Sequence, residues 1–232
     1  MHSPRQESDT ICGGGGPEEI LELLAACVDG DSGAASRLLR AHAPAAAESA
    51  RAASLARLVN AAVFRSSWEG ASGVIPEPPL HVAAKHGHLA VCKLLLEAGA
   101  DAAAVSRGGY TALFDAAWAG RDAVVQLLLQ AGCPIEGANR SSALLIAVNK
   151  GHASVVSALV RGGADVLAET GDGRAPWRSA ADGRQPAVAE ALIYLSPPAL
   201  QAQLRSLVEG WTIEVLPGHG AHGEVRRPAA SA

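Results

Sequence analysis

The sequence predicts an all-α solenoid, in which short helix–turn–helix units stack in a row instead of enclosing one globular core. Residues 78–101 read PPLHVAAKHGHLAVCKLLLEAGAD, and the same pattern returns about 33 residues later, twice clearly and once faintly. A repeat of this length is the signature of stacked repeat architectures. Composition agrees, because only 3% of the 232 residues are aromatic. This suits small, closely packed helices better than a sandwich or a barrel.

Columns of identical or similar residues fix the register of the repeat. One glycine column is Gly87, Gly120 and Gly151, a second is Gly99, Gly132 and Gly163, and a leucine column is Leu80, Leu113 and Leu144. Both glycine columns are spaced 33 and then 31 residues apart, and each leucine precedes a glycine of the first column by seven residues. Independent columns that keep one phase indicate a true repeat.

Each unit is expected to contain two helices. Leu80, Ala83 and Ala84 fall at i, i+3 and i+4, which is one face of a short helix, and the next apolar run repeats this spacing. The glycines are expected to end the helices, because a residue without a Cβ adopts a left-handed conformation at little cost. The polar stretch at 100–109 favours a turn or hairpin.

The motif PLHVAA followed by GH, and then by V-x-x-LLL-x-x-GAD, resembles the ankyrin repeat, whose signature is T-P-L-H-x-A in a 33-residue unit. The second copy keeps Thr111 but has Phe114 in place of the histidine, and the third has Leu145 there. The resemblance is clear over residues 78–165. It implies a stack of helix–turn–helix units joined by β-hairpin-like turns.

The flanking units are more divergent. A degenerate fourth copy begins at Ala175, with Trp177 in the leucine column, and the segment at 23–39 resembles a capping unit. The ankyrin-repeat domain is therefore expected to span residues 18–195. Within it, Gly30 and Gly87 lie 57 residues apart, which is one unit plus some 24 residues. Residues 45–77 are consequently an insert or a degenerate repeat.

The ends of the chain carry other expectations. Residues 1–17 are polar with a glycine run and are expected to form a disordered tail, as are residues 210–232. Residues 196–209 are expected to form a C-terminal capping helix, with Ser196 as its N-cap and Pro197 at its first position. Since each unit contacts only its neighbours, truncating Leu127 in the middle should cost more stability than truncating Leu204.

Composition narrows the class of function. The net charge of −4 does not suggest nucleic-acid binding, which favours a basic face. No apolar run approaches the ~18 residues that span a bilayer, and the N-terminal residues lack the apolar core of a signal peptide. The four cysteines have the spacing of neither a zinc site nor a disulfide framework. We expect a monomeric cytoplasmic or nuclear protein with reduced thiols.

No motif of an enzyme is present in the sequence. There is no P-loop, no dinucleotide-binding glycine motif opening a helix, no H-E-x-x-H and no G-x-S-x-G. His81, His86 and His88 are close in sequence, but His81 and His88 occupy columns in which ankyrin repeats carry histidine. Structural hydrogen bonding is therefore expected there, and no catalytic residue, cofactor or metal site is predicted.

The expected activity is binding of a protein partner. By resemblance to the family, the partner lies against the hairpin tips and the first helices of the units, which form a concave surface. The candidate contact residues are Lys85, His86, Arg107, Tyr110, Asp115, Trp118, Asn149 and Lys150. Trp118 leads this set, because exposed tryptophans often dominate binding energy. Its alternative is packing against Phe114 or a neighbouring helix.

Two functions are left open by the sequence. One is a non-catalytic interaction module or scaffold. The other is an adaptor that recruits a ubiquitin ligase or another enzyme complex through its C-terminal segment, as ankyrin proteins with a SOCS box do. Residues 200–208 are short for that box and lack its cysteine-bearing helix and later leucine–proline pattern.

Overall fold

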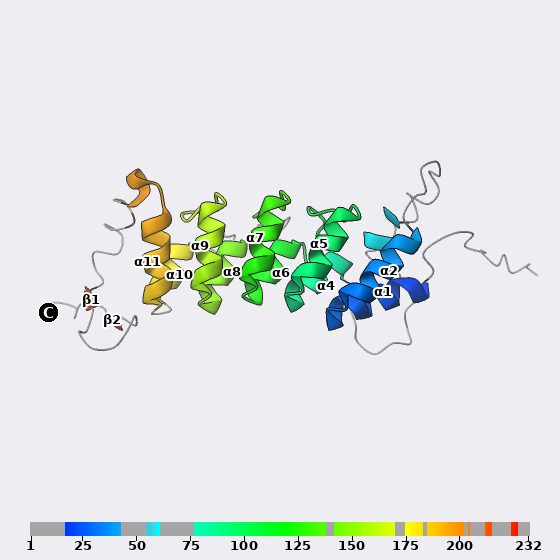
Figure 1. Cartoon of the computed structure of the whole chain (residues 1–232). Coiled ribbons are helices and arrows are strands. Elements are labelled where there is room, and N and C mark those ends of the chain that lie inside the picture. The colour runs from blue at the N-terminus through cyan, green and yellow to red at the C-terminus, as the bar shows by residue number, and fades with distance from the viewer. Residues whose placement is uncertain are drawn as a thin grey trace, which may run out of the picture.

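The computed structural model describes residues 17–42, 55–56, 58–60, 77–137, 142–169, 175–182, 185–201, 204, 212–214 and 224–226. Over these residues the chain forms helix pairs that follow one another in a row, from α1 and α2 at one end to α10 and α11 at the other (Figure 1). The predicted α-solenoid is confirmed.

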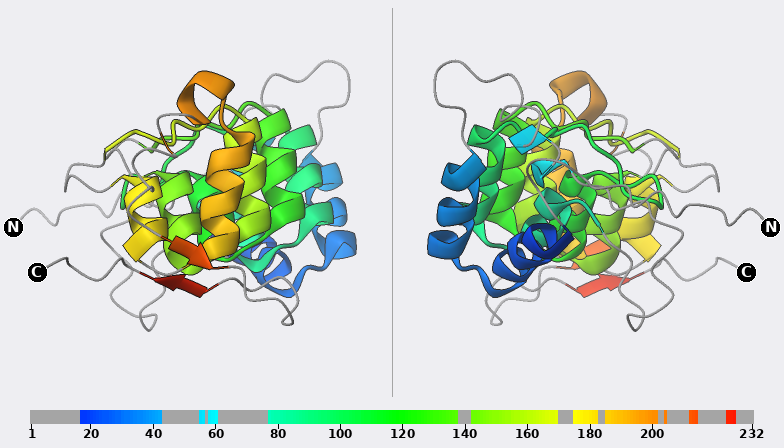
Figure 2. Two further views of the ribbon diagram at one scale, coloured as in Figure 1. Left: turned by 90° about the vertical axis from the view of Figure 1, so that its left-hand side faces the viewer. Right: turned by 90° about the vertical axis from the view of Figure 1, so that its right-hand side faces the viewer.

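Five helix pairs make up the described stack. They are α1 (Pro17–Asp29) with α2 (Ser32–His42), α4 (Pro79–His86) with α5 (Leu89–Glu97), α6 (Ala112–Trp118) with α7 (Asp122–Gln130), α8 (Ala143–Lys150) with α9 (Ala153–Arg161), and α10 (Pro176–Asp182) with α11 (Pro186–Leu195). The first helices contact one another in chain order and form an inner layer, and the second helices do the same in an outer layer. Figure 2 looks along this stack from its two ends.

Helix boundaries follow the local chemistry that the sequence suggested. The Thr111 side chain accepts a hydrogen bond from the Phe114 N–H at 3.2 Å, and Ser142 caps α8 in the same way. At the other end of the first helices, Gly87 has φ = 86° and Gly120 has φ = 70°. The prediction that glycines end these helices is therefore confirmed.

The units are joined by hairpin-like turns, as the resemblance implied. Isolated antiparallel bridges pair Val105 with Thr111 and Glu136 with Ser142. In the first of these turns, the Ser106 N–H donates to the Tyr110 carbonyl at 2.8 Å. These bridges hold the start of a first helix close to the loop that precedes it.

The core is one continuous column along the stack. The repeated leucines, Leu80, Leu113 and Leu144, are at most 2% exposed, and the alanines beside them are buried. Small residues at these positions allow the inner helices to approach one another closely. Each unit thus completes its core only against its neighbours.

A second contact between units recurs along the stack, and we call it the clasp. The residue after the first-column glycine reaches back to a carbonyl of the preceding unit: His88 Nε2 to Val28 at 2.9 Å, Arg121 Nε to Lys85 at 3.3 Å, and His152 Nε2 to Trp118 at 3.3 Å. Because a carbonyl only accepts, each ring or guanidinium nitrogen donates. The clasp side chain also covers the first-column glycine of the preceding unit. An added Cβ on Gly120, for example, would lie 2.8 Å from His152 Cε1.

Gln185 occupies the corresponding position in the last unit. Its amide packs over Gly151, where an added Cβ would lie 3.5 Å from Nε2. Its Oε1 is buried and has no hydrogen-bond partner among the described residues. The last joint of the stack therefore has the packing of the clasp, with an acceptor that has no partner in the described part of the chain.

The first two units stack directly although many residues separate them. Helix α1 contacts α4 and α2 contacts α5, and His88 reaches Val28 across 60 residues, where the other two clasps cross 36 and 34. This arrangement favours an insert at residues 45–77 over an additional stacked repeat. Most of that segment lies outside the described residues.

A short helical part of the insert returns to the stack. Leu58 and Val59 are buried in the common core. The Asn60 side chain donates to the Gly99 carbonyl at 3.3 Å and accepts from the Asp101 N–H at 2.7 Å. The insert is thereby attached to the loop that follows α5.

The start of the last helical turn differs from the prediction in two respects, because Ser196 does not cap it and because it begins at Pro198 and not at Pro197. The Ser196 hydroxyl donates to the Leu192 carbonyl of α11, and the N–H groups of Leu200 and Gln201 donate to Pro197. The prediction of Ser196 as an N-cap is therefore wrong, because its hydroxyl is used by the preceding helix. Leu204 is only 1% exposed, so this last turn does cover the end of the core.

Two short strands lie within residues 210–232, which the sequence predicts to be a disordered tail. Strand β1 (Thr212–Glu214) pairs antiparallel with β2 (Glu224–Arg226), with Ile213 opposite Val225. Both central residues are β-branched, which favours extended backbone. Three-residue strands are too short to show the alternation from which strands are predicted.

The two leucines at the centre of α7 are expected to differ in their effect on stability. Leu128 is fully buried, whereas Leu127 is only partly buried, so the sequence-based choice of Leu127 as the buried leucine is corrected. We expect Leu128→Ala to cost about 2–5 kcal/mol of unfolding free energy. Leu127→Ala should cost less, about 1–2 kcal/mol. Urea unfolding followed by circular dichroism measures both, and equal losses would contradict this assignment of the core.

Gly120 and Gly132 have similar backbone angles but different surroundings. Substitutions at these two glycines therefore distinguish the cost of backbone strain from the cost of steric overlap with a neighbouring side chain. Gly120 (φ = 70°) is covered by His152, whereas an added Cβ on Gly132 (φ = 77°) would meet nothing within 4 Å. We expect Gly132→Ala to cost about 1–2 kcal/mol from backbone strain alone. Gly120→Ala should cost about 1–3 kcal/mol more, because the clasp must move. Thermal unfolding of the two variants side by side tests this, and equal melting temperatures would argue against the clasp.

Candidate protein-binding surface

The structure brings three of the predicted contact residues together on the inner layer. Trp118 at the end of α6 is 43% exposed. The Lys85 ammonium of α4 lies 5.9 Å from the centre of its ring, and the Lys150 ammonium of α8 lies 5.0 Å from it. Two lysines from the neighbouring units thus flank one exposed tryptophan. We call Lys85, Trp118 and Lys150 the tryptophan cluster.

The Trp118 ring lies near both lysine ammoniums, and Phe114, its alternative packing partner, makes its stacking contact elsewhere. The Phe114 ring stacks instead on Tyr110, with centroids 4.3 Å apart and planes inclined by 21°. A cation near an aromatic face at an exposed site contributes about 0.5–1 kcal/mol, which is enough to favour one orientation of the indole. The backbone of Trp118 is fixed separately, because its carbonyl accepts the clasp hydrogen bond from His152.

Asp115 has a structural partner that was not predicted from the sequence. Its carboxylate lies 2.7 Å from His81 Nδ1, and the other ring nitrogen of His81 lies 3.1 Å from the Ala104 carbonyl. His81 is fully buried. The predicted structural hydrogen bonding of His81 is confirmed. Asp115 therefore ties α6 to α4, although it was predicted to contact a partner.

His86, which follows Lys85 at the end of α4, is exposed. It stacks on His88 with ring centroids 6.0 Å apart and an interplanar angle of 1°. His88 itself bonds to the Val28 carbonyl, as predicted for its column. Asn149, at the end of α8 next to Lys150, is also exposed.

The remaining two candidates belong to the hairpin before α6. Tyr110 is half-buried between Phe114 and Gly108, where an added Cβ would lie 2.6 Å from Tyr110 Cε2. The tyrosine ring therefore packs against both the hairpin backbone and the first turn of α6. Arg107 is exposed in the same turn. These residues sit at the opposite end of α6 from Trp118, so the eight candidates do not form one contact cluster.

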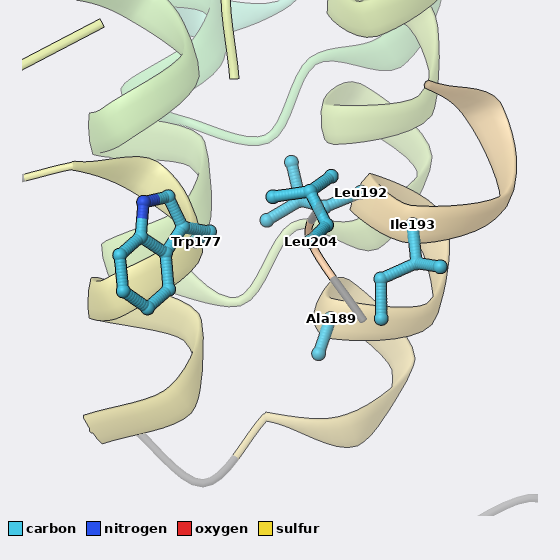
Figure 3. A pocket seen from close by; sticks show the side chains of 5 residues that line it. All are labelled: Trp177, Ala189, Leu192, Ile193 and Leu204. Atoms are coloured by element: carbon cyan, nitrogen blue, oxygen red, sulfur yellow. The ribbon is translucent and has the colours of Figure 1, made fainter. Parts of the chain in front are cut away.

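A small cavity lies at the C-terminal end of the stack, between α10, α11 and the last turn (Figure 3). It has a volume of about 10 Å³, close to the lower limit for one water molecule. The side chains that line it are Trp177, Ala189, Leu192, Ile193 and Leu204. Such a space is a packing gap under the cap and offers no room for a ligand.

No cluster of three or more metal-ligating side chains occurs among the described residues. Nor is any helix in this part of the chain long and apolar enough to cross a bilayer. Three cysteines, Cys27, Cys92 and Cys133, are buried and form no disulfide. Burial raises the pKa of Cys27 and of Cys92 to about 12, and that of Cys133 to about 11.

These thiols are expected to be unreactive in the folded protein. The thiolate is the reactive form, and a pKa of about 12 in Cys27 and Cys92 keeps the thiolate fraction very small until the pH approaches that value. In a Cys12→Ser variant at mildly alkaline pH, we expect iodoacetamide to modify none of the three thiols before denaturation and all three after it. Mass spectrometry counts the adducts, and modification of the native protein would contradict the buried assignment.

The comparison with known families agrees with this geometry. A model of ankyrin repeats in three copies matches residues 23–139, and a model of a single ankyrin repeat matches residues 139–171. The matched region begins in α1 and ends beyond α9, so it covers the tryptophan cluster and all three clasps. Ankyrin repeats generally mediate protein–protein interaction and are typically non-catalytic. The chain belongs to the ankyrin-repeat family.

Proposed function

We propose that this protein is a non-catalytic interaction module that binds a protein partner on its inner layer, with Trp118 at the centre of the contact. It would act as a monomeric scaffold in the cytoplasm or nucleus, without a cofactor. The observation that carries this function is the exposed indole in the middle of the stack, held between Lys85 and Lys150 from the adjacent units.

The position of Trp118 suits a binding residue for two reasons. Tryptophan offers a large apolar area with few rotatable bonds, so little side-chain entropy is lost when a partner covers it. In addition, its main chain is clasped by His152 and its ring is flanked by lysines before any partner arrives. Such preorganisation lowers the cost of association.

A second exposed aromatic residue provides a matched control. Tyr194 on α11 is 69% exposed and belongs to the outer layer, on a different unit from Trp118. Its truncation removes an exposed aromatic side chain without touching α4, α6 or α8.

We expect Trp118→Ala to abolish capture of the partner and Tyr194→Ala to leave it intact. Wild type and both variants are used as baits in cell lysate, and captured proteins are quantified by mass spectrometry. Loss of a central interface tryptophan typically costs 2 kcal/mol or more, about 30-fold in affinity. Equal helical content by circular dichroism shows that all three baits are folded.

Two results would argue against this function. Partners lost equally with Tyr194→Ala and Trp118→Ala would indicate a general loss of stability or nonspecific binding. Partners retained by Trp118→Ala, and captured by residues 196–232 fused to an inert carrier, would favour the adaptor that recruits an enzyme complex.

A further inference from the structure

We infer that the partner presents an acidic peptide segment, whose carboxylates bind Lys85 and Lys150 on either side of Trp118. This inference rests on the proposed function and specifies the chemistry of the partner.

The inner helices of the three central units are basic although the whole chain carries a net charge of −4. The basic residues of helices α4, α6 and α8 are Lys85, Lys150, the exposed His86 and the buried His81, and their single acidic residue is Asp115. That carboxylate is bound to His81 and lies largely buried. The charged side chains that these three helices leave for a partner are therefore positive, and electrostatic complementarity favours an anionic partner.

Both lysines keep their hydrogen-bonding capacity. Each ammonium has three N–H donors. Within the part of the chain that the structure describes, neither Lys85 nor Lys150 has a carboxylate within ion-pair distance, and their observed contact is with the indole. Lys85 and Lys150 lie in the last turns of α4 and α8, where the helix dipole stabilises a positive charge. This interaction does not use the N–H donors of the ammonium groups, which stay available to a partner.

The spacing suits an extended peptide. The two ammoniums lie 5.9 Å and 5.0 Å from the centre of one ring, on side chains from opposite neighbours of α6. Side chains two residues apart on one face of an extended strand are separated by about 7 Å. Two acidic side chains spaced in this way can reach both lysines while the segment covers the indole. Exposed charges of this kind attract an oppositely charged partner, and their main effects are on the rate of its association and on the salt dependence of binding.

Selection from a library of short random peptides tests the charge preference directly. Peptides are selected on the wild-type protein, and their binding is then measured by fluorescence polarisation. We expect the enriched peptides to carry more Asp and Glu than the input library. Their Kd should rise about 10-fold with Lys85→Glu/Lys150→Glu, since exposed ion pairs contribute modestly and two are reversed.

The matched control reverses the same number of charges on the outer layer. Lys93 on α5 and Arg161 on α9 are exposed, so Lys93→Glu/Arg161→Glu changes the net charge equally and leaves the tryptophan cluster untouched. We expect this double variant to bind the enriched peptides within twofold of wild type. A selection repeated on Lys85→Glu/Lys150→Glu should enrich basic peptides instead.

The outcomes separate this inference from the proposed function. Enriched peptides that need Trp118 but carry no excess of acidic residues would overturn the acidic partner and leave the binding surface standing. Acidic peptides that bind Lys85→Glu/Lys150→Glu as well as wild type would also overturn it. Peptides that bind Trp118→Ala as well as wild type, or no enrichment above the empty support, would overturn both.

Discussion

The clasp between neighbouring units is the contact on which the geometry of the stack depends. A side chain from one unit must reach a backbone carbonyl of the unit before it, and the residue it crosses is Gly30, Gly87 or Gly120. That glycine also turns the chain with a positive φ, so a Cβ there is disfavoured twice. The clasp explains why glycine occupies each position that it crosses, while its own donor alternates between histidine and arginine.

The same contact links the scaffold to the candidate binding surface. Two of the accepting carbonyls belong to Lys85 and Trp118, whose side chains meet on the inner layer. The clasp residues Arg121 and His152 therefore each fix the main chain of a candidate binding residue on the preceding unit. The clasp between the first two helix pairs, from His88 to Val28, has the same geometry although residues 45–77 lie between these pairs in the sequence. This is possible because the entropy cost of closing a longer loop grows only slowly with its length.

Much of the fold could be predicted from the sequence, and the candidate site only in part. Glycine and leucine columns located the helix pairs because periodicity reports which face of a helix is buried. Periodicity does not report which side chains meet across units, so the partnership of Asp115 with His81 and the flanking of Trp118 by lysines were missed. The available signal was spacing: Asp115 follows His81 by 34 residues, one repeat plus one. Neighbouring leucines likewise look equivalent in sequence, and only packing distinguishes Leu127 from Leu128.

The replacement of the clasp donor by Gln185 has a consequence for the order in which the stack comes apart. The buried Oε1 of Gln185 has no partner among the described residues. When this last joint opens, that oxygen becomes exposed to water and regains its hydration, which lowers the cost of opening. At the other joints, opening breaks a hydrogen bond made by histidine or arginine. Terminal repeats already lack one neighbour. By this contribution alone, opening the joint of the C-terminal pair costs less than opening the other joints, and it leaves intact the clasps among the three units that carry the tryptophan cluster.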